Sequence, residues 1–225
     1  MKVKIRVKIK KSPFVIVLFL LLVLAVILYH SVSGNAQKRE TLVAWSPSIK
    51  PVDSITQRPS ACSTANQNAV LSRSSGLDVL GGSGGTAKES PKYSYYSRGW
   101  SADDQWWLLS GISTQGYHKI ELTFYIKGSD TGPKYFALEY SPDGNEWRPL
   151  AESNNTLIVY AVNADNKFHQ QGPYLLSNVV DNADTLFIRF INTDKKAVSG
   201  STVQSSGTNY IANITVTALP IGTAR

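Results

Sequence analysis

Aromatic residues gather in one short stretch of this sequence. Three tyrosines and three tryptophans lie within fifteen residues: Tyr93, Tyr95, Tyr96, Trp100, Trp106 and Trp107. The apolar face of a sugar ring stacks well on an aromatic ring, while polar neighbours bind the sugar hydroxyls. The stretch therefore indicates ligand binding by stacking, with Trp100, Trp106 and Trp107 as candidate ligand-binding residues. The competing interpretation is that the same rings fill the core of the fold.

Strand geometry would separate the two adjacent tryptophans of this stretch. Neighbouring side chains of a strand point to opposite faces, so one of Trp106 and Trp107 belongs to the core and the other faces outward. Alternation alone leaves the choice open. Our expectation for the outward ring is Trp107, because Trp106 shares its face with Leu108.

Three further residues extend the candidate ligand-binding set. Tyr125 and Tyr135 fall on outward positions of two predicted strands, and His169 falls in a predicted loop where it can face a ligand. The plain alternative for each is an ordinary surface residue. Together with the tryptophans, these residues predict a polar and aromatic recognition surface.

Groups that could catalyse a reaction are few and poorly arranged. Asp103 and Asp104 are adjacent carboxylates, but neighbours on a strand point to opposite faces. His118 could act as a base and Ser110 or Ser113 as a nucleophile, yet no Gly-x-Ser-x-Gly elbow surrounds either serine. The sequence has no phosphate-binding loop or dinucleotide motif, and its single Cys and three His disfavour a classical zinc site. We therefore predict no enzyme, no cofactor and no metal.

The positive charge of the chain is concentrated in its first residues. The formal net charge is +7, and six basic residues lie between residues 2 and 11. From residue 12 onward, 17 basic residues face 16 acidic ones. The fold itself is thus nearly neutral, which removes the electrostatic support for a nucleic-acid-binding protein.

A membrane-targeting segment follows the basic residues. Residues 14–28 form an unbroken apolar run, whose length lies between that of a signal peptide and that of a spanning helix. Cleavage and retention both remain open. Residues 1–36 are predicted to be a cytoplasmic basic flank plus signal peptide or signal anchor, with the membrane contact at residues 13–29 if uncleaved. Residues 37–225 are predicted to be an extracellular domain.

Period-two alternation dominates the chain beyond residue 40 and predicts an all-β fold. Residues 117–127 and 135–141 are the clearest strands and are predicted to form a hairpin, and the turn at residues 141–144 should lead into a further strand at 146–150. Other predicted strands are 41–46, 69–73, 93–97, 105–110, 156–162, 185–192 and 210–217. Nine or ten strands predict a jelly-roll-type antiparallel β-sandwich preceded by an N-terminal hydrophobic helix, with a glycine-rich surface loop at residues 76–91.

Three segments of the predicted strands carry a family resemblance. They are Leu42 to Trp45, the run TGPKYFALEYSPDGNEW from Thr131 to Trp147, and YIANITV from Tyr210 to Val216. They resemble the galactose-binding-like jelly-roll modules of bacterial secreted and surface proteins. The resemblance implies that fold for about residues 41–218, and sugar binding, adhesion or spacing as its function. Related modules often have an acidic residue where this chain has Ala212, so no calcium site is expected there.

The residues and the resemblance together predict a non-catalytic extracellular recognition module that binds a glycan or another cell-surface polymer. The alternative is a structural or assembly subunit of a cell-envelope complex that makes protein contacts. A hydrolase of unfamiliar type is the third interpretation. The module is secreted if the signal is cleaved, and otherwise is a single-pass membrane protein with a cytoplasmic N-terminus.

Overall fold

The computed structural model describes residues 37–52, 54, 56–83, 91–102, 104–150 and 159–222. The predicted membrane segment and its basic flank lie outside these residues, and so does Asp103. Residues 39–225 form one of the two compact units of the chain, and all that follows concerns this unit. Within the described residues, no helix is long and apolar enough to cross a bilayer.

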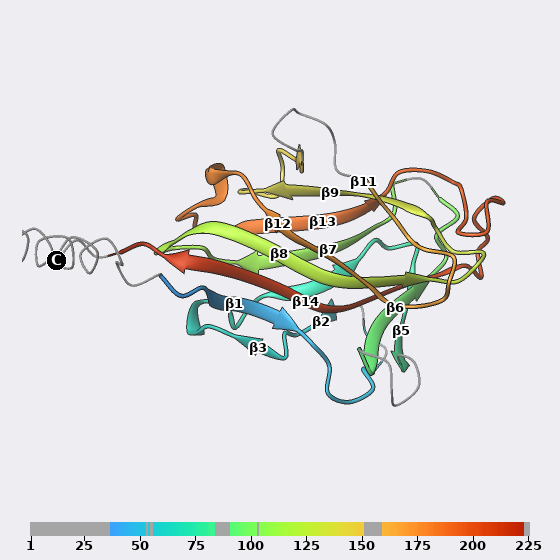
Figure 1. The fold of residues 1–225 in the computed structure, drawn as a ribbon, viewed down its shortest axis with the longest axis horizontal. Helices are drawn as coiled ribbons and strands as arrows, with labels where there is room; N and C mark the ends of the chain where they lie inside the picture. The colour runs from blue at the N-terminus through green and yellow to red at the C-terminus, as the bar shows by residue number, and fades with distance from the viewer. Residues whose placement is uncertain are drawn as a thin grey trace, which may run out of the picture. The chain divides into compact units, whose positions relative to one another are not determined.

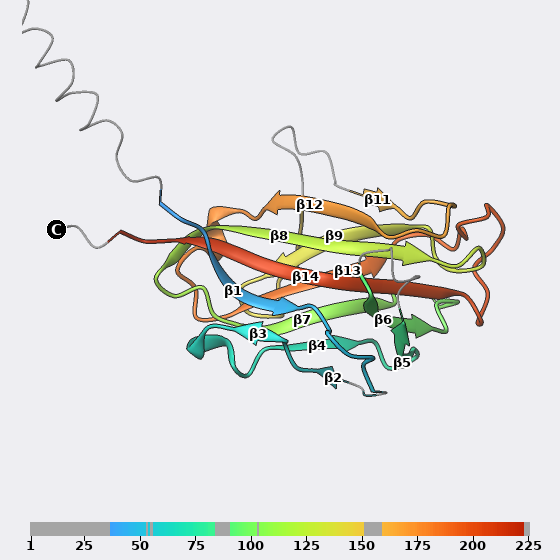
Figure 2. The ribbon, with the colours of Figure 1, turned by 60° about the horizontal axis from the view of Figure 1, so that its bottom comes forward.

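Two antiparallel sheets make up the unit (Figure 1). Sheet A has the strand order β12-β8-β14-β1-β3, and Figure 2 shows these five strands side by side. In the same sheet, β6 pairs with both β14 and β5. Sheet B has the order β10-β9-β13-β7-β4-β2, with β11 paired to β9. The strands are β1 (Glu40–Trp45), β2 (Thr56–Gln57), β3 (Ala61–Cys62), β4 (Val70–Arg73), β5 (Asp78–Ser83), β6 (Tyr93–Arg98), β7 (Trp106–Ile112), β8 (Tyr117–Gly128), β9 (Tyr135–Ser141), β10 (Arg148–Pro149), β11 (Val159–Ala161), β12 (His169–Leu175), β13 (Leu186–Asn192) and β14 (Thr208–Pro220). Two 3-10 helices, η1 (Thr64–Asn66) and η2 (Asn178–Val180), lie between strands.

The two sheets pack face to face around large side chains. Phe124 of sheet A meets Phe190 of sheet B edge to face, with ring centroids 4.8 Å apart. The indole N–H of Trp107 in sheet B donates a 2.9 Å hydrogen bond to Asn209 Oδ1 in sheet A. Trp100, from the loop after β6, lies 5.9 Å from Trp107 between ring centroids. This arrangement confirms the predicted all-β antiparallel sandwich.

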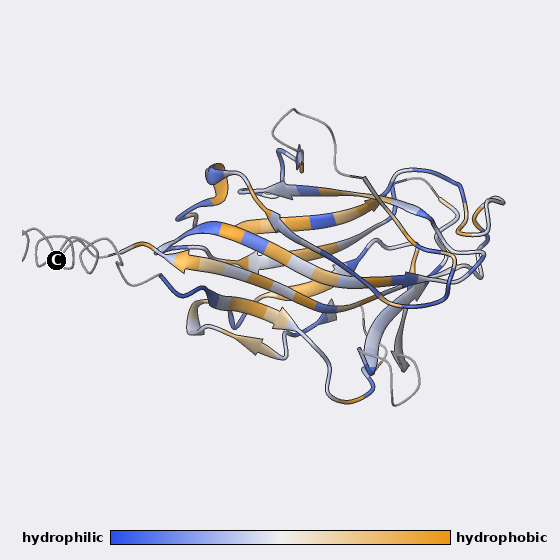
Figure 3. Ribbon diagram, in the orientation of Figure 1, coloured by the Kyte–Doolittle hydropathy of each residue, from blue (hydrophilic) through white to orange (hydrophobic). Residues whose placement is uncertain are grey.

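Alternation predicts correctly which side of a strand is buried. In β8, Ile120, Leu122, Phe124 and Ile126 are buried, and the residues between them are only half-buried. Figure 3 shows hydrophobic and hydrophilic residues alternating along this strand. The bounds of β9 agree with the predicted ones, and the turn after it leads into β10, which pairs with β9.

The predicted hairpin between β8 and β9 is wrong, because the two strands lie in different sheets. The connection between them is tied to the start of β14, where the N–H of Ser129 donates a 2.9 Å hydrogen bond to the carbonyl of Thr208. A Cβ at Gly132 would lie 2.3 Å from the same carbonyl oxygen, so this close approach requires glycine. Alternation identifies the buried face of a strand but not the sheet to which the strand belongs.

Two strands occupy segments that the sequence predicts as loops. β5 forms within the glycine-rich segment and pairs with β6 over six residues. Glycines pair through their backbone groups and supply no alternating side chains. β12 begins at His169 and pairs with β8, but its register shifts between Gln171 and Tyr174. Neither segment therefore shows the periodicity by which strands are recognised.

Candidate functional site

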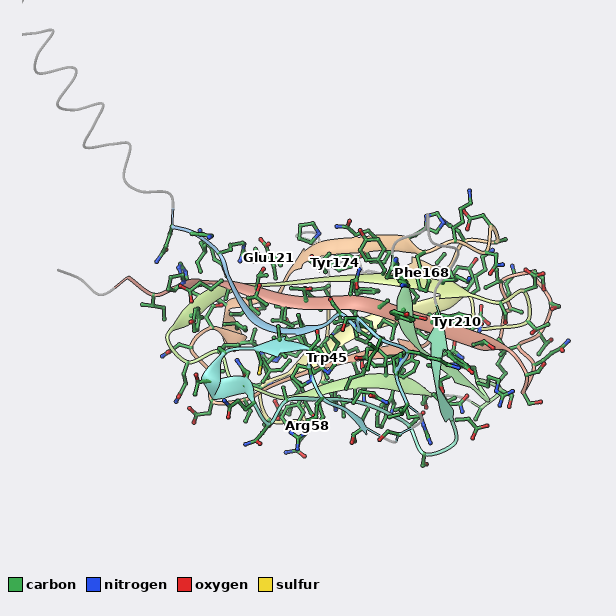
Figure 4. The ribbon with its side chains drawn as sticks, turned by 90° about the horizontal axis from the view of Figure 1, so that it is seen from below. Trp45, Arg58, Glu121, Phe168, Tyr174 and Tyr210 are labelled. Carbon is green, nitrogen blue, oxygen red and sulfur yellow. The ribbon has the colours of Figure 1, made fainter. Side chains whose placement is uncertain are left out.

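Three aromatic rings and one lysine form a row across the outer face of sheet A. We call Tyr96, Tyr210, Lys127 and Phe168 the aromatic row. Tyr210 of β14 pairs with Tyr96 of β6 on one side and with Lys127 of β8 on the other. Phe168 directly precedes His169 of β12, which pairs with the residue before Lys127. Figure 4 shows Phe168 and Tyr210 close together on one side of the sandwich.

Contacts between neighbouring side chains hold the aromatic row together. The ring centroids of Tyr96 and Tyr210 are 5.4 Å apart, and those of Phe168 and Tyr210 are 6.4 Å apart. The Lys127 ammonium lies 5.2 Å from the Tyr210 centroid and 5.5 Å from the Phe168 centroid. All four residues are half-buried, so each keeps part of its surface in water. The row is a partly exposed aromatic strip with a positive charge over its rings.

Strand alternation explains why these side chains share one face. In β14, Asn209 and Ile211 are buried, and Tyr210 between them is half-buried. In β8, Ile126 is buried and Lys127 after it is half-buried. Paired residues of neighbouring antiparallel strands point to the same side of the sheet. The pairing of Tyr210 with Lys127 therefore places both side chains on the outer face.

Polar groups border the aromatic row. The Tyr125 hydroxyl donates a 2.9 Å hydrogen bond to Gln170 Oε1. His169 Nε2 lies 2.8 Å from Asp165 Oδ2. The hydrogen bond from His169, followed by that from the N–H of Lys167, holds the pKa of the Asp165 carboxyl below its usual value. The outer face thus offers stacking rings beside the Tyr125 hydroxyl and the Gln170 amide, whereas His169 pairs with the buried Ile126 and by alternation belongs to the other face of β12.

Lys127 carries a charge that no carboxylate neutralises in the described part of the chain. None of the three ion pairs found there includes it. Its ammonium contacts the faces of Tyr210 and Phe168 instead. Burial raises the pKa of the Tyr210 phenol above its usual value, and neighbouring Tyr96 adds to the effect. The phenol stays protonated at neutral pH and leaves the lysine charge uncompensated.

The structure divides the candidate ligand-binding residues among the core and the two outer faces. Trp100 and Trp107 are in the core, with 0% and 1% of their surface exposed. Trp106 and Tyr135 lie on the outer face of sheet B. Tyr125 lies on the outer face of sheet A, near the aromatic row. The aromatic stretch of the sequence is therefore not one surface.

The outward tryptophan of β7 is Trp106, and the expectation that Trp107 faces outward is wrong. Trp107 shares its face with Leu109, which is fully buried. Leu108 and Leu109 follow in sequence, so either tryptophan has an apolar neighbour on its own face. Asn209, the cross-sheet partner that accepts the Trp107 hydrogen bond, lies 102 residues away in the sequence.

Sequence reasoning missed the members of the aromatic row as ligand-binding candidates. Tyr96 belongs to the aromatic stretch but was not selected, and Phe168 is the neighbour of the selected His169. Tyr210 and Lys127 occupy outward positions of predicted strands, and this position is the feature of the sequence that could have identified them as candidates. The strand pairing that joins these residues is long-range and has no local signature in the sequence.

The outer face of sheet B is more apolar than that of sheet A. Trp106 pairs with Ile191, which pairs in turn with Ala137 on the other side. Leu108 extends the same apolar surface by two residues along β7. Aliphatic side chains border the Trp106 indole here, in contrast to the neighbouring rings of the aromatic row.

Trp147 follows the turn after β9 and is half-buried rather than part of the core. The Arg189 guanidinium lies 4.1 Å from the Trp147 ring centroid. Arg189 Nε also donates a 2.5 Å hydrogen bond to Glu139 Oε2. Trp147 thus makes a cation–π contact on the outer face of sheet B.

The candidate catalytic residues are not brought together. In the described residues, no hydrogen bond joins His118 of β8 to Ser110 of β7 or to Ser113, which is bonded to Asn66 through its N–H. No group of three or more His, Cys, Asp or Glu that could hold a metal ion occurs in the same residues.

The chain matches no protein-family model and no curated protein. Its fold resembles solved carbohydrate-binding modules. The CBM22-1 xylan-binding domain of Paenibacillus barcinonensis Xyn10C has a TM-score of 0.44 at 13% identity, over 83% of this chain and 99% of that one. The family 29 module CBM29-2, a mutant in complex with mannohexaose, has a TM-score of 0.43 at 9% identity, over 80% and 92%. The N-terminal cellulose-binding domain of Cellulomonas fimi β-1,4-glucanase C has a TM-score of 0.37 at 8% identity, over 66% and 86%.

Proposed function

We propose that this domain is a non-catalytic glycan-binding module and that the aromatic row is its binding surface. The observation that carries the proposal is the alignment of Tyr96, Tyr210 and Phe168 across neighbouring strands of one outer face. A row of partly exposed rings suits the apolar faces of consecutive sugars in a chain. The Tyr125 and Gln170 pair beside it supplies a hydroxyl and an amide for the sugar hydroxyls.

The remainder of the outer face of sheet A also suits a polar ligand. Thr215 of β14 pairs with Thr123 of β8, and Thr217 pairs with Glu121. These residues are half-buried, and their side chains alternate with the buried ones. Threonine hydroxyls both donate and accept hydrogen bonds, so they can exchange them with sugar hydroxyls. These threonines lie further along β8 and β14, whereas the aromatic row crosses these strands, so they border a glycan stacked on the row rather than extend its path.

The proposal includes an extracellular or cell-surface location. It is supported by the basic residues followed by the apolar run at residues 14–28, which is typical of a membrane-targeting segment. The proposed partners are accordingly a cell-surface glycan and, if the segment is retained, the membrane itself.

Affinity electrophoresis and a glycan array test this proposal. The protein is the full chain, purified in a detergent without a sugar headgroup, because sugar headgroups would compete for the row. We expect Tyr210→Ala and Phe168→Ala to weaken binding about tenfold, or ~1.4 kcal/mol, because each removes a stacking ring. The matched control is Trp106→Ala, which removes a half-buried ring from the other outer face and should leave binding unchanged. If both row variants still bind, the aromatic row is not the binding surface. If the unaltered protein binds no glycan, the proposed function is wrong.

The alternative function is a structural or assembly subunit that contacts an envelope protein. The observation that favours it is the partly exposed apolar surface of Trp106, Leu108 and Ile191 on sheet B. Contact through the β12 edge has less support, because β12 contains Pro173, which lacks an N–H, and its register shifts there. This alternative predicts that Trp106→Ala weakens assembly with an envelope protein while the row variants do not.

A further inference from the structure

We infer that the glycan bound by the aromatic row is anionic, with carboxylate groups on its sugar rings. This inference rests on the proposed function and adds the chemical class of the ligand. It starts from Lys127, which lies inside the row rather than at its border. Its neighbours on the two sides are Tyr210, which pairs with it, and Phe168, whose ring is within cation–π distance.

The environment of Lys127 leaves its positive charge available to a ligand. The aromatic faces that it contacts carry no formal charge, and cation–π contacts use ring faces rather than hydrogen-bond acceptors. The ammonium therefore retains N–H groups that can donate hydrogen bonds to a ligand carboxylate. Because Lys127 is only half-buried, a ligand stacked on the rings can reach it from the solvent side.

Other charged groups around the row do not cancel this charge. Asp165, on the β12 side, is hydrogen-bonded to His169, and no ion pair joins it to Lys127 in the described residues. On the β6 side, Arg98 pairs in register with Asp78 of β5, so that corner adds no net charge. Lys127 thus has no carboxylate partner among the described residues. A carboxylate on the bound sugar would complete the site, whereas a neutral sugar would leave the charge unused.

Two matched pairs of polymers test the inference with the full chain in the same detergent. Each pair has one backbone with free or masked carboxylates: polygalacturonate and its methyl ester, and alginate and its propylene glycol ester. Affinity electrophoresis measures binding of the unaltered protein, of Lys127→Met and of Lys127→Arg. Lys134→Met is the matched control, because the Lys134 ammonium also lies over a ring, that of Tyr135, at 5.5 Å, but beside sheet B.

We expect tighter binding to at least one free carboxylate polymer than to its ester. Lys127→Met should lower the affinity for that polymer about threefold to tenfold, as for a partly exposed ion pair, with the ester unaffected. Lys127→Arg and Lys134→Met should bind both polymers with the affinity of the unaltered protein. Raising the salt concentration from about 0.05 to 0.5 M should reduce the difference in affinity between the free polymer and its ester.

Equal affinity for the free and esterified polymers would overturn the inference while leaving the proposed glycan-binding function intact. Equal loss for both polymers in Lys127→Met would also overturn it, since the lysine would then only order the rings. If neither polymer of either pair binds, the anionic class is rejected, and the glycan array described above decides separately whether the domain binds neutral glycans.

Discussion

The outer faces of the two sheets are built from the same alternating pattern but differ in what they expose. Sheet A presents the aromatic row and then threonines, with the Lys127 charge unpaired in the described residues. Sheet B presents an apolar surface around Trp106, and its Arg189 charge is paired with Glu139 and covers Trp147. The two faces therefore differ in that a carboxylate pairs with Arg189, whereas none pairs with Lys127 in the described residues.

This difference shows why a count of aromatic residues does not locate a site. Trp147 resembles the rings of the aromatic row in its exposure and in its contact with a cation. Its cation, however, is held by Glu139, whereas Lys127 has no such partner in the described part of the chain. The contact of Arg189 with Trp147 thus differs from that of Lys127 with Tyr210 in having a carboxylate as a third member.

The largest effect that we predict is on stability, and it distinguishes the inward tryptophan of β7 from the outward one. Trp107→Ala should lower the free energy of unfolding by about 3–5 kcal/mol, because it empties a core position and leaves Asn209 without its buried donor. Trp106→Ala, the adjacent control, should cost less than about 1.5 kcal/mol, because its ring is only half-buried. Chemical denaturation of both variants measures the difference. Equal costs would show that the sheet has no distinct outer face at this position.

A smaller effect tests whether the Trp147 contact is structural. Trp147→Ala should lower stability by about 1–2 kcal/mol, from the loss of a half-buried ring and its cation–π contact with Arg189. Glycan affinity should not change. Arg189→Lys is the control, because it keeps the charge but not the flat guanidinium. A loss of binding in Trp147→Ala would extend the recognition surface to sheet B and remove the contrast between the two faces.

The smallest effect concerns Asp165, which is hydrogen-bonded to His169 at the start of β12. The folded-state pKa of Asp165 is lowered mainly by its hydrogen bond with His169, so its stabilising contribution is present above the usual carboxyl pKa of about 4 and disappears as the pH falls through the lowered value. Asp165→Asn should therefore lower the unfolding temperature slightly at pH 6 and less at pH 3. Thermal unfolding at both pH values measures this. A larger effect at pH 3 would contradict the assigned direction of the pKa shift.

The sequence predicted the strands with regular alternation, but not the strands with which they pair. Alternation identified β8 and the buried set from Ile120 to Ile126, since that pattern is local. It placed β9 beside β8, because nothing local records that Gly132 approaches Thr208 and leads the chain to the other sheet. It missed β12, whose register shift interrupts the pattern.

The same limit explains the outcome for the candidate site. Tyr125 was found because its outward position can be read from its own strand. The inward orientation of Trp107 depends on Asn209, a residue that only the fold brings near. The aromatic row joins Tyr96, Lys127, Phe168 and Tyr210 from four separate segments, and no spacing in the sequence predicts their contact.

The most direct test of the account is a side-by-side binding isotherm for Tyr210→Ala and Trp106→Ala on one polysaccharide that the unaltered protein binds. Each variant removes one half-buried ring from one outer face, so the two are matched in chemistry and differ in place. The account predicts about tenfold weaker binding for Tyr210→Ala and unchanged binding for Trp106→Ala, with both proteins folded by circular dichroism. Unchanged binding in Tyr210→Ala together with a loss in Trp106→Ala would contradict it and place recognition on sheet B.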